Sequence, residues 1–104
     1  MSEWNVQLTE AALSDIHEAI GYIRAQLGAP FAAEDFLDKV DAQVELLEKP
    51  PKSRPLVRDY GLAKAGYRWC AAGNFLMFFT LDEEMHCVYV QRVLYGARDW
   101  RMLL

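Results

Sequence analysis

The stretch FLMFFTL at residues 75–81, with the turn DEEM at 82–85 and CVYVQRVLY at 87–95, decides the fold. The first run is almost wholly apolar, which is typical of a strand covered on both faces. The charged residues after it form a turn, and the last run is again strand-like. These 21 residues therefore predict two long strands joined by a tight connection.

A third strand is predicted immediately upstream, at residues 67–71. Ala72-Gly73-Asn74 is a turn signal that joins it to the run at 75–81. The three strands then form an antiparallel meander. Gly96 ends the last strand, and residues 97–104 are expected to form a short helical turn.

The N-terminal half predicts one strand and one amphipathic helix. Residues 3–8 alternate, with Trp4, Val6 and Leu8 on one side, as in a strand with one buried face. Thr9 offers a hydroxyl as an N-cap for the helix that follows. Gly28 is expected to end that helix. Its apolar residues recur at spacings of three and four and predict the buried stripe: Leu13, Ile16, Ile20, Ile23 and Leu27.

A second helix is predicted between Pro30, which suits a first turn, and Pro50-Pro51, which ends it. Only Gly-Ala-Pro separates the two helices, so they must form an antiparallel hairpin. The expected order is βααβββ in a single α+β domain spanning residues 1–104. The buried stripe of the second helix is Ala33, Phe36, Val40, Val44 and Leu47, with Leu37 beside it.

Residues 51–66 show little periodicity and are interpreted as an irregular, exposed connection with one short strand at residues 56–57. The connection carries four basic residues: Lys52, Arg54, Arg58 and Lys64.

Composition excludes several classes of protein. Hydrophobic residues make up 53% of the 104, enough for a core without disulfides or metal. The longest apolar run, at residues 75–79, is too short to span a membrane, where roughly 20 residues are needed. No basic region followed by an apolar stretch marks a secretion signal, so a cytoplasmic location is expected.

The cysteines and histidines favour a protein without metal or cofactor. Cys70 and Cys87 lie in apolar strands, and in a chain without a secretion signal two free buried thiols are expected rather than a disulfide. His17 and His86 have no partner at metal-ligand spacing.

Charge is distributed unevenly along the chain. Residues 1–50 hold ten acidic and three basic side chains (3 − 10 = −7), and residues 51–104 hold five acidic and eight basic ones (8 − 5 = +3). This asymmetry indicates either an anionic partner for the second half or an ordinary solvated surface.

Arginines on or beside the strands are the candidate functional residues. Arg68 lies in the first strand of the meander, Arg92 lies between valines of the last, and Arg98 and Arg101 follow it. An arginine in so apolar a strand needs a partner, either a carboxylate such as Asp99 or an external phosphate or carboxylate. The planar fork of arginine suits phosphate. Four aromatic residues nearby could stack on a base or pack in the core: Tyr60, Tyr67, Trp69 and Tyr95.

The motifs Gly66-x-Arg68 and Arg92-x-x-Tyr95-Gly96-x-Arg98-Asp99, with the order of elements, resemble the RelE/ParE superfamily of toxins from type II toxin–antitoxin systems. The resemblance covers nearly the whole chain and implies a RelE-like fold and a plasmid stabilisation toxin. RelE-like members cleave mRNA on the ribosome without metal. ParE-like members instead poison DNA gyrase.

The resemblance implies a role for each candidate residue. As an mRNA endonuclease, the protein would use Arg68, Arg92 and Tyr95 in catalysis and would arrest growth when free of its antitoxin. Its RNA- and phosphate-binding residues would be Lys52, Arg54, Arg58, Lys64 and Arg98.

Two departures favour other activities. The last strand ends without a histidine, and the sequence pI is 5.1. A phenol, with an ordinary pKa of about 10, is a poor base at neutral pH. The alternatives are a gyrase poison whose target contact is the segment 98–104, and a weakly active homologue that serves mainly to bind antitoxin. In every case the expected partner is a cognate antitoxin, whose acidic, amphipathic tail would cover Arg68, Arg92 and Arg98 in a hetero-oligomer.

Overall fold

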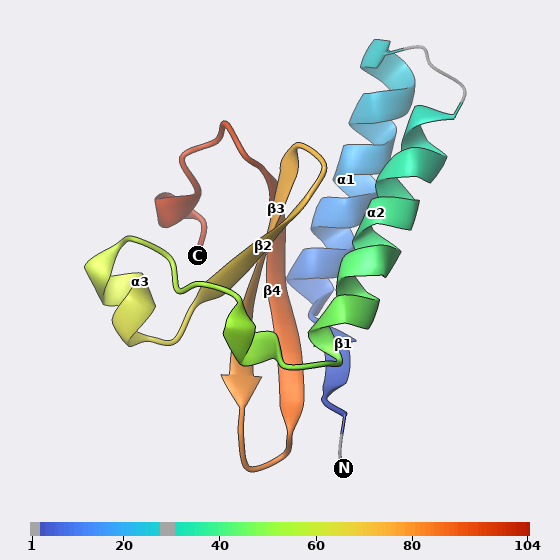
Figure 1. Ribbon diagram of the computed structural model, residues 1–104. Helices are drawn as coiled ribbons and strands as arrows, with labels where there is room; N and C mark the ends of the chain where they lie inside the picture. The colour runs from blue at the N-terminus through green and yellow to red at the C-terminus, as the bar shows by residue number, and fades with distance from the viewer. Residues whose placement is uncertain (1–2, 28–30) are drawn as a thin grey trace.

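The computed structural model describes residues 3–27 and 31–104, and it has the predicted α+β fold (Figure 1). The predicted roles of Gly28 and Pro30 lie outside the described residues. The elements, in chain order, are β1 (Asn5–Leu8), α1 (Glu10–Leu27), α2 (Ala32–Leu47), the 3₁₀ turn η1 (Pro51–Ser53), α3 (Tyr60–Lys64), β2 (Arg68–Ala72), β3 (Phe75–Asp82), β4 (Cys87–Tyr95) and the 3₁₀ turn η2 (Trp100–Met102).

The strands form one mixed sheet in the order β1-β4-β3-β2. The predicted antiparallel meander of β2, β3 and β4 is confirmed. The N-terminal strand β1 adds to it in parallel with β4, with Leu8 opposite Val90. A parallel neighbour requires a crossover, which α1 and the following elements provide.

Helices α1 and α2 cover one face of the sheet (Figure 1). Along β3 the side chains alternate between the two faces. Met77 and Phe79 pack with the helices, and Phe78 packs on the opposite face. All three are at most 1% exposed, which confirms a strand covered on both sides. The helix-side core contains buried residues from both helices and all strands but β1, among them Ala12, Ile16, Phe36, Val40, Leu47, Val88 and Val93.

The opposite face has a thinner cover made of α3, the chain before it and the C-terminal segment (Figure 1). Its buried cluster consists of Val57, Phe78 and Leu94. Trp100 packs on Phe78 with ring centroids 5.0 Å apart. The turn η2 that contains Trp100 confirms the predicted helical turn at the C-terminal end.

The buried stripe of α1 differs from the prediction at Leu13, which is 51% exposed. The side facing the sheet is formed by Ala12, Ile16, Ala19 and Ile23. Two of these are alanines, whose small side chains let the helix approach the sheet closely. The spacing of hydrophobic residues favoured Leu13 as the buried residue of the first turn, whereas the smaller Ala12 is buried there.

Residues 51–66 are more ordered than predicted. They contain η1 and α3, and Asp59 caps α3 by accepting a hydrogen bond from the Leu62 N–H at 3.1 Å. The short strand expected at residues 56–57 is an isolated bridge from Leu56 to Arg68. Val57 is buried, so the connection is not uniformly exposed. A single turn of helix is too short to show a periodic pattern, and for this reason the sequence did not predict it.

The turn between β2 and β3 is one residue shorter than predicted, because Ala72 belongs to β2. Gly73 and Asn74 make the turn, and Gly73 adopts a φ of 62°, which favours glycine.

Both cysteines are free and buried, as expected. Burial raises the pKa of the Cys70 thiol to about 11, against a smaller lowering by Arg54. No described helix is long and apolar enough to cross a membrane.

Candidate functional site

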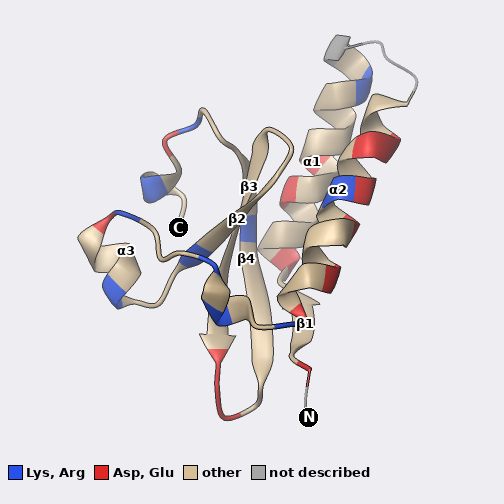
Figure 2. Ribbon diagram, in the orientation of Figure 1, with Lys and Arg blue, Asp and Glu red and all other residues tan. Residues whose placement is uncertain are grey.

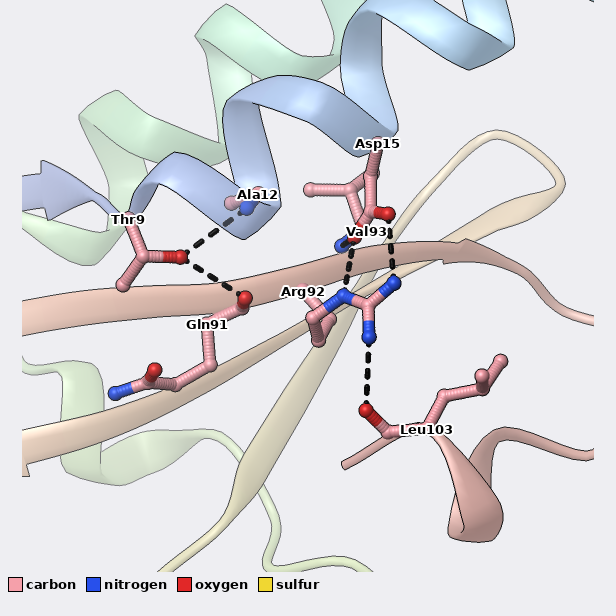
Figure 3. Close-up of polar contacts among 7 residues, drawn as sticks. All are labelled: Thr9, Ala12, Asp15, Gln91, Arg92, Val93 and Leu103. Carbon is pink, nitrogen blue, oxygen red and sulfur yellow. Dashed lines mark hydrogen bonds and ion pairs between the residues drawn. The ribbon is translucent and has the colours of Figure 1, made fainter.

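The end of β1 leaves part of β4 without a strand neighbour, and Asp15 occupies that place (Figure 3). Thr9 ends the strand and caps α1. Its Oγ1 accepts from the Ala12 N–H at 3.1 Å and donates to the Gln91 carbonyl at 3.0 Å. One turn later, Asp15 Oδ2 accepts the backbone N–H of Val93 at 3.0 Å. A helix side chain thereby satisfies a backbone group that a longer β1 would have paired.

Arg92 is bound to the same carboxylate through a two-pronged ion pair. Its Nε donates to Asp15 Oδ2 at 2.7 Å, and its Nη2 donates to Asp15 Oδ1 at 2.8 Å. The remaining nitrogen, Nη1, donates to the Leu103 carbonyl at 2.8 Å. The hydrogen bond to Asp15 raises the pKa of Arg92 above its ordinary value, against the opposing effect of partial burial. Every nitrogen of this guanidinium has a protein partner.

A bulge in β4 places Arg92 at this position. Phe78 faces Arg92 and Phe79 faces Val90, so Gln91 is the extra residue. The extra residue allows Val90 and Val93 both to pack in the helix-side core, although they are three apart. Arg92 is then free to reach Asp15 at the edge of the sheet.

Of the two roles left open for Arg92, the structure shows the ion pair, and the partner is Asp15 rather than Asp99. Asp99 instead lies 3.5 Å from Arg101, in a pair whose side chains are 67% and 62% exposed. The helical spacing of α1 places the carboxylate of Asp15 on the buried side, which is the sequence signal for this partner. Asp15 lies three residues after Ala12 and four before Ala19, on the buried side of its helix.

Arg68 has a different environment. Its Nη1 donates to the carbonyls of Lys52 and Arg54, at 3.2 and 2.7 Å. These contacts fasten the chain that follows α2 to β2. Arg68 therefore helps to hold the chain after α2 in place, and it does so through one of its guanidinium nitrogens, Nη1.

Tyr95 lies at the end of β4, three residues beyond Arg92. Its ring meets Phe75 edge-on at 5.7 Å, and its side chain is 47% exposed. Tyr95 pairs with Phe75 and Arg68 with Phe79, so they are four residues apart along β3 and on opposite sides of it. That register corresponds to about 16 Å between their backbones. The structure does not bring the three predicted catalytic residues together.

The predicted phosphate-binding residues divide into two groups. Lys52 pairs with Glu83 at 2.8 Å, and Lys64 lies 5.8 Å from the centre of the Tyr60 ring. The backbone carbonyl of Arg54 accepts a hydrogen bond from Arg68. Arg58 and Arg98 come from distant parts of the chain and line one hollow of about 310 Å³. Of the predicted stacking residues, Tyr60 is 78% exposed, whereas Tyr67 and Trp69 pack on the cluster around Phe78.

An open groove of about 750 Å³ lies where the helical hairpin meets the start of β3 and the end of β4. Apolar side chains make up most of its wall. Its charged residues are three acids and two bases: Asp15, Glu18, Asp35, Lys39 and Arg98. Hydrophobic periodicity could not predict the groove, because its walls come from five elements: α1, α2, β2, β3 and β4. In the described part of the chain, no group of three metal-ligating side chains could hold a metal ion.

Comparison with known proteins identifies the family. A family model described as ParE toxin of the type II toxin–antitoxin system parDE matches residues 6–100. The chain belongs to the ParE toxin family. It is therefore a toxin of a type II toxin–antitoxin system, within the RelE/ParE superfamily that the sequence motifs resemble. Comparison of this chain with curated proteins found no significant match.

Solved structures agree with this ParE-family fold. A chain from the chromosomal ParDE toxin–antitoxin system of P. aeruginosa is similar with a TM-score of 0.70 and 16% identity, covering 89% of this chain and 96% of that one. A chain of the RelBE2 toxin–antitoxin complex of Mycobacterium tuberculosis gives a TM-score of 0.55 and 21% identity, covering 89% and 98%.

Proposed function

We propose that this ParE-family toxin acts by binding a protein target, DNA gyrase, and does not cleave RNA. The observation that carries the proposal is the state of Arg92, whose nitrogens are all engaged by Asp15 and Leu103. To contact a phosphate, Arg92 would have to leave a carboxylate that is only 9% exposed. Breaking such a pair leaves a desolvated charge without compensation.

The separation of the other residues supports the same proposal. Attack by a ribose hydroxyl needs a base and cations within a few ångströms of one phosphate, because catalysis depends on such positioning. Arg68 and Tyr95 occupy register positions four residues apart on opposite sides of β3, so they do not form a ready-made cluster around one phosphate. The family model that matches is ParE, which agrees with the gyrase alternative rather than with mRNA cleavage.

The target contact in this proposal is the C-terminal segment, residues 98–104. Its inner side is held by the sheet, through Trp100 on Phe78 and through Leu103 bound to Arg92. Its outer side carries Met102, 84% exposed, and the exposed side chain of Arg101. A rigid segment that presents an apolar and a cationic side chain is suited to docking on a protein surface.

The groove is the proposed antitoxin site. It is lined by apolar side chains, and Tyr22 and Tyr95 at its wall are 61% and 47% exposed. An amphipathic segment could bury these residues. Asp15 is paired with Arg92, which leaves Glu18 and Asp35 against Lys39 and Arg98, so the charges of the groove favour neither a basic segment nor the acidic one that the sequence suggested. The similar RelBE2 structure is that of a toxin–antitoxin complex, which supports a bound antitoxin as the resting state.

Two assays on the same protein test the proposal. Purified toxin is expected to inhibit gyrase supercoiling, and transcripts mapped after induction are expected to stay intact. The double variant Arg68→Gln/Tyr95→Phe should remain toxic, whereas Arg101→Ala/Met102→Ala should lose toxicity and gyrase inhibition. A matched surface control is Met85→Ala, at the far turn of the sheet and 71% exposed.

Cleaved transcripts that disappear in the Arg68→Gln/Tyr95→Phe variant would contradict the proposal and restore the mRNA endonuclease. Expression without any growth defect would instead indicate a homologue that mainly binds antitoxin. Circular dichroism of each variant separates loss of activity from loss of fold.

A further inference from the structure

A small hollow lies where the chain before α3 meets the segment after β4. Its volume is about 310 Å³. The two contributing segments are 40 residues apart in sequence, at Arg58 and Arg98. The hollow is lined by Arg58, Asp59, Ala97, Arg98, Asp99, Trp100 and Arg101.

The two carboxylates of the hollow already have partners. Asp59 accepts the Leu62 N–H as the cap of α3, and Asp99 lies 3.5 Å from Arg101. In the described part of the chain, neither Arg58 nor Arg98 has a carboxylate at ion-pair distance. Three guanidinium groups and two carboxylates therefore line one cavity, and the excess positive charge and the lack of an ion pair at Arg58 and Arg98 favour an external anion.

The wall of the hollow is fixed by packing. Trp100 is held on Phe78, and the Arg98 N–H donates to the Tyr95 carbonyl at 3.0 Å. The cap at Asp59 fixes the residue next to Arg58. The backbones that carry both arginines are therefore set before any ligand binds, so less entropy is lost on binding.

The charges beyond the hollow indicate an extended anion rather than a single group. Figure 2 shows basic residues on α3, on the chain before it and on the C-terminal segment, and acidic residues along α1 and α2. Arg54 and Lys64 belong to the same basic stretch of the sequence as Arg58. Spaced cations on one side of a protein fit the regularly spaced phosphates of a nucleic acid.

We propose that this hollow binds a phosphodiester group of duplex DNA, so that the toxin contacts the DNA held by its target as well as the target itself. The proposal rests on the proposed function for its setting, because a gyrase complex contains duplex DNA. Arg58 and Arg98 clasp the phosphate, Arg101 assists when it leaves Asp99, and the acidic helices orient away from the duplex.

Binding of a fluorescein-labelled DNA duplex, measured by anisotropy without gyrase over a series of salt concentrations, tests the site. Arg58→Gln/Arg98→Gln is expected to weaken binding at low salt at least about tenfold and to reduce the slope of log K against log salt by about 2. The matched control, Arg24→Gln/Lys49→Gln, removes the same charge from exposed positions of the acidic half and should change affinity less than about twofold.

Equal weakening by the two double variants would overturn the site, since only net charge would then matter. Absence of DNA binding would overturn it too. So would binding of poly-glutamate without binding of DNA, because the site would then recognise carboxylates rather than phosphodiesters. These results are separable from the proposed function. If the protein inhibits supercoiling but has no affinity for DNA, the proposed function stands and the DNA site is refuted. If it binds DNA through the hollow but does not inhibit gyrase, the DNA site stands and the proposed function is refuted.

Discussion

The two faces of the sheet are covered by hydrophobic cores of different size. The helix side has a continuous core of fifteen buried residues, from Ala12 to Val93, beneath an acidic layer. Among the described residues, the buried cluster of the opposite side has only three members, Val57, Phe78 and Leu94, beneath short basic segments. Buried apolar area is the main source of stability, so the helix side holds the fold together. The thin side is left to present the arginines and the C-terminal segment, and Asp15 and Arg92 join the two.

The strongest test of this contrast compares neighbouring phenylalanines of β3. Phe79→Ala, on the helix side, is expected to lower the free energy of unfolding by about 3–5 kcal/mol. Phe78→Ala should cost less, about 2–3 kcal/mol, because the thin layer can collapse into the space. Urea denaturation gives both values. Hydrogen exchange should rise at residues 97–104 in the Phe78 variant alone; equal costs and a uniform rise would show that the faces are not distinct.

Breaking the link between the faces should have the next largest effect. Asp15→Ala leaves Arg92 without its ion pair and the Val93 N–H without its acceptor. We expect a loss of about 2–4 kcal/mol in urea denaturation, with faster exchange in the C-terminal segment. The control is Glu18→Ala, an exposed acid one turn further along α1, which should stay within about 0.5 kcal/mol. An Asp15 variant as stable as this control would show that Arg92 does not need its partner.

Alkaline pH should weaken the helix-side core through Cys70. Its pKa is raised from 9.0 to about 11 by burial, so the folded state keeps the proton that the unfolded chain releases. Stability should therefore be unaffected by this group below pH 9 and fall as pH rises from 9 to 11, by about 2–3 kcal/mol at the upper end. Urea midpoints across this range should fall less steeply in Cys70→Ala. Parallel curves for the two proteins would refute the assignment.

Much of the fold could be predicted from single segments. The alternation in β1, the spacing in α1 and α2 and the apolar run of β3 each reflect burial within one element, and all four were confirmed. The errors lie where packing between elements decides. Leu13 fits the helical spacing but is exposed, and the single turn of α3 has no period to detect.

The candidate site was less predictable. The sequence identified Arg68, Arg92 and Tyr95 by residue type and motif, yet their arrangement depends on strand register and on one bulge. Arg68 and Tyr95 belong to separate motifs, and the sheet places them four residues apart on opposite sides of β3. Arg58 and Arg98 share a hollow that no local pattern indicates.

The sequence by itself determined the two long helices and the four strands, that the second half is basic, and the superfamily that its motifs resemble. Only the tertiary structure decided what those basic residues do. Arg92 and Asp15 are 77 residues apart in the chain. They meet because β1 ends at Leu8 and α1 begins two residues later, at Glu10. Strand β4 continues past the end of β1, so α1 lies beside its last residues. Periodicity records which side of an element is buried, whereas the partner of a buried charge is set by how separate elements pack.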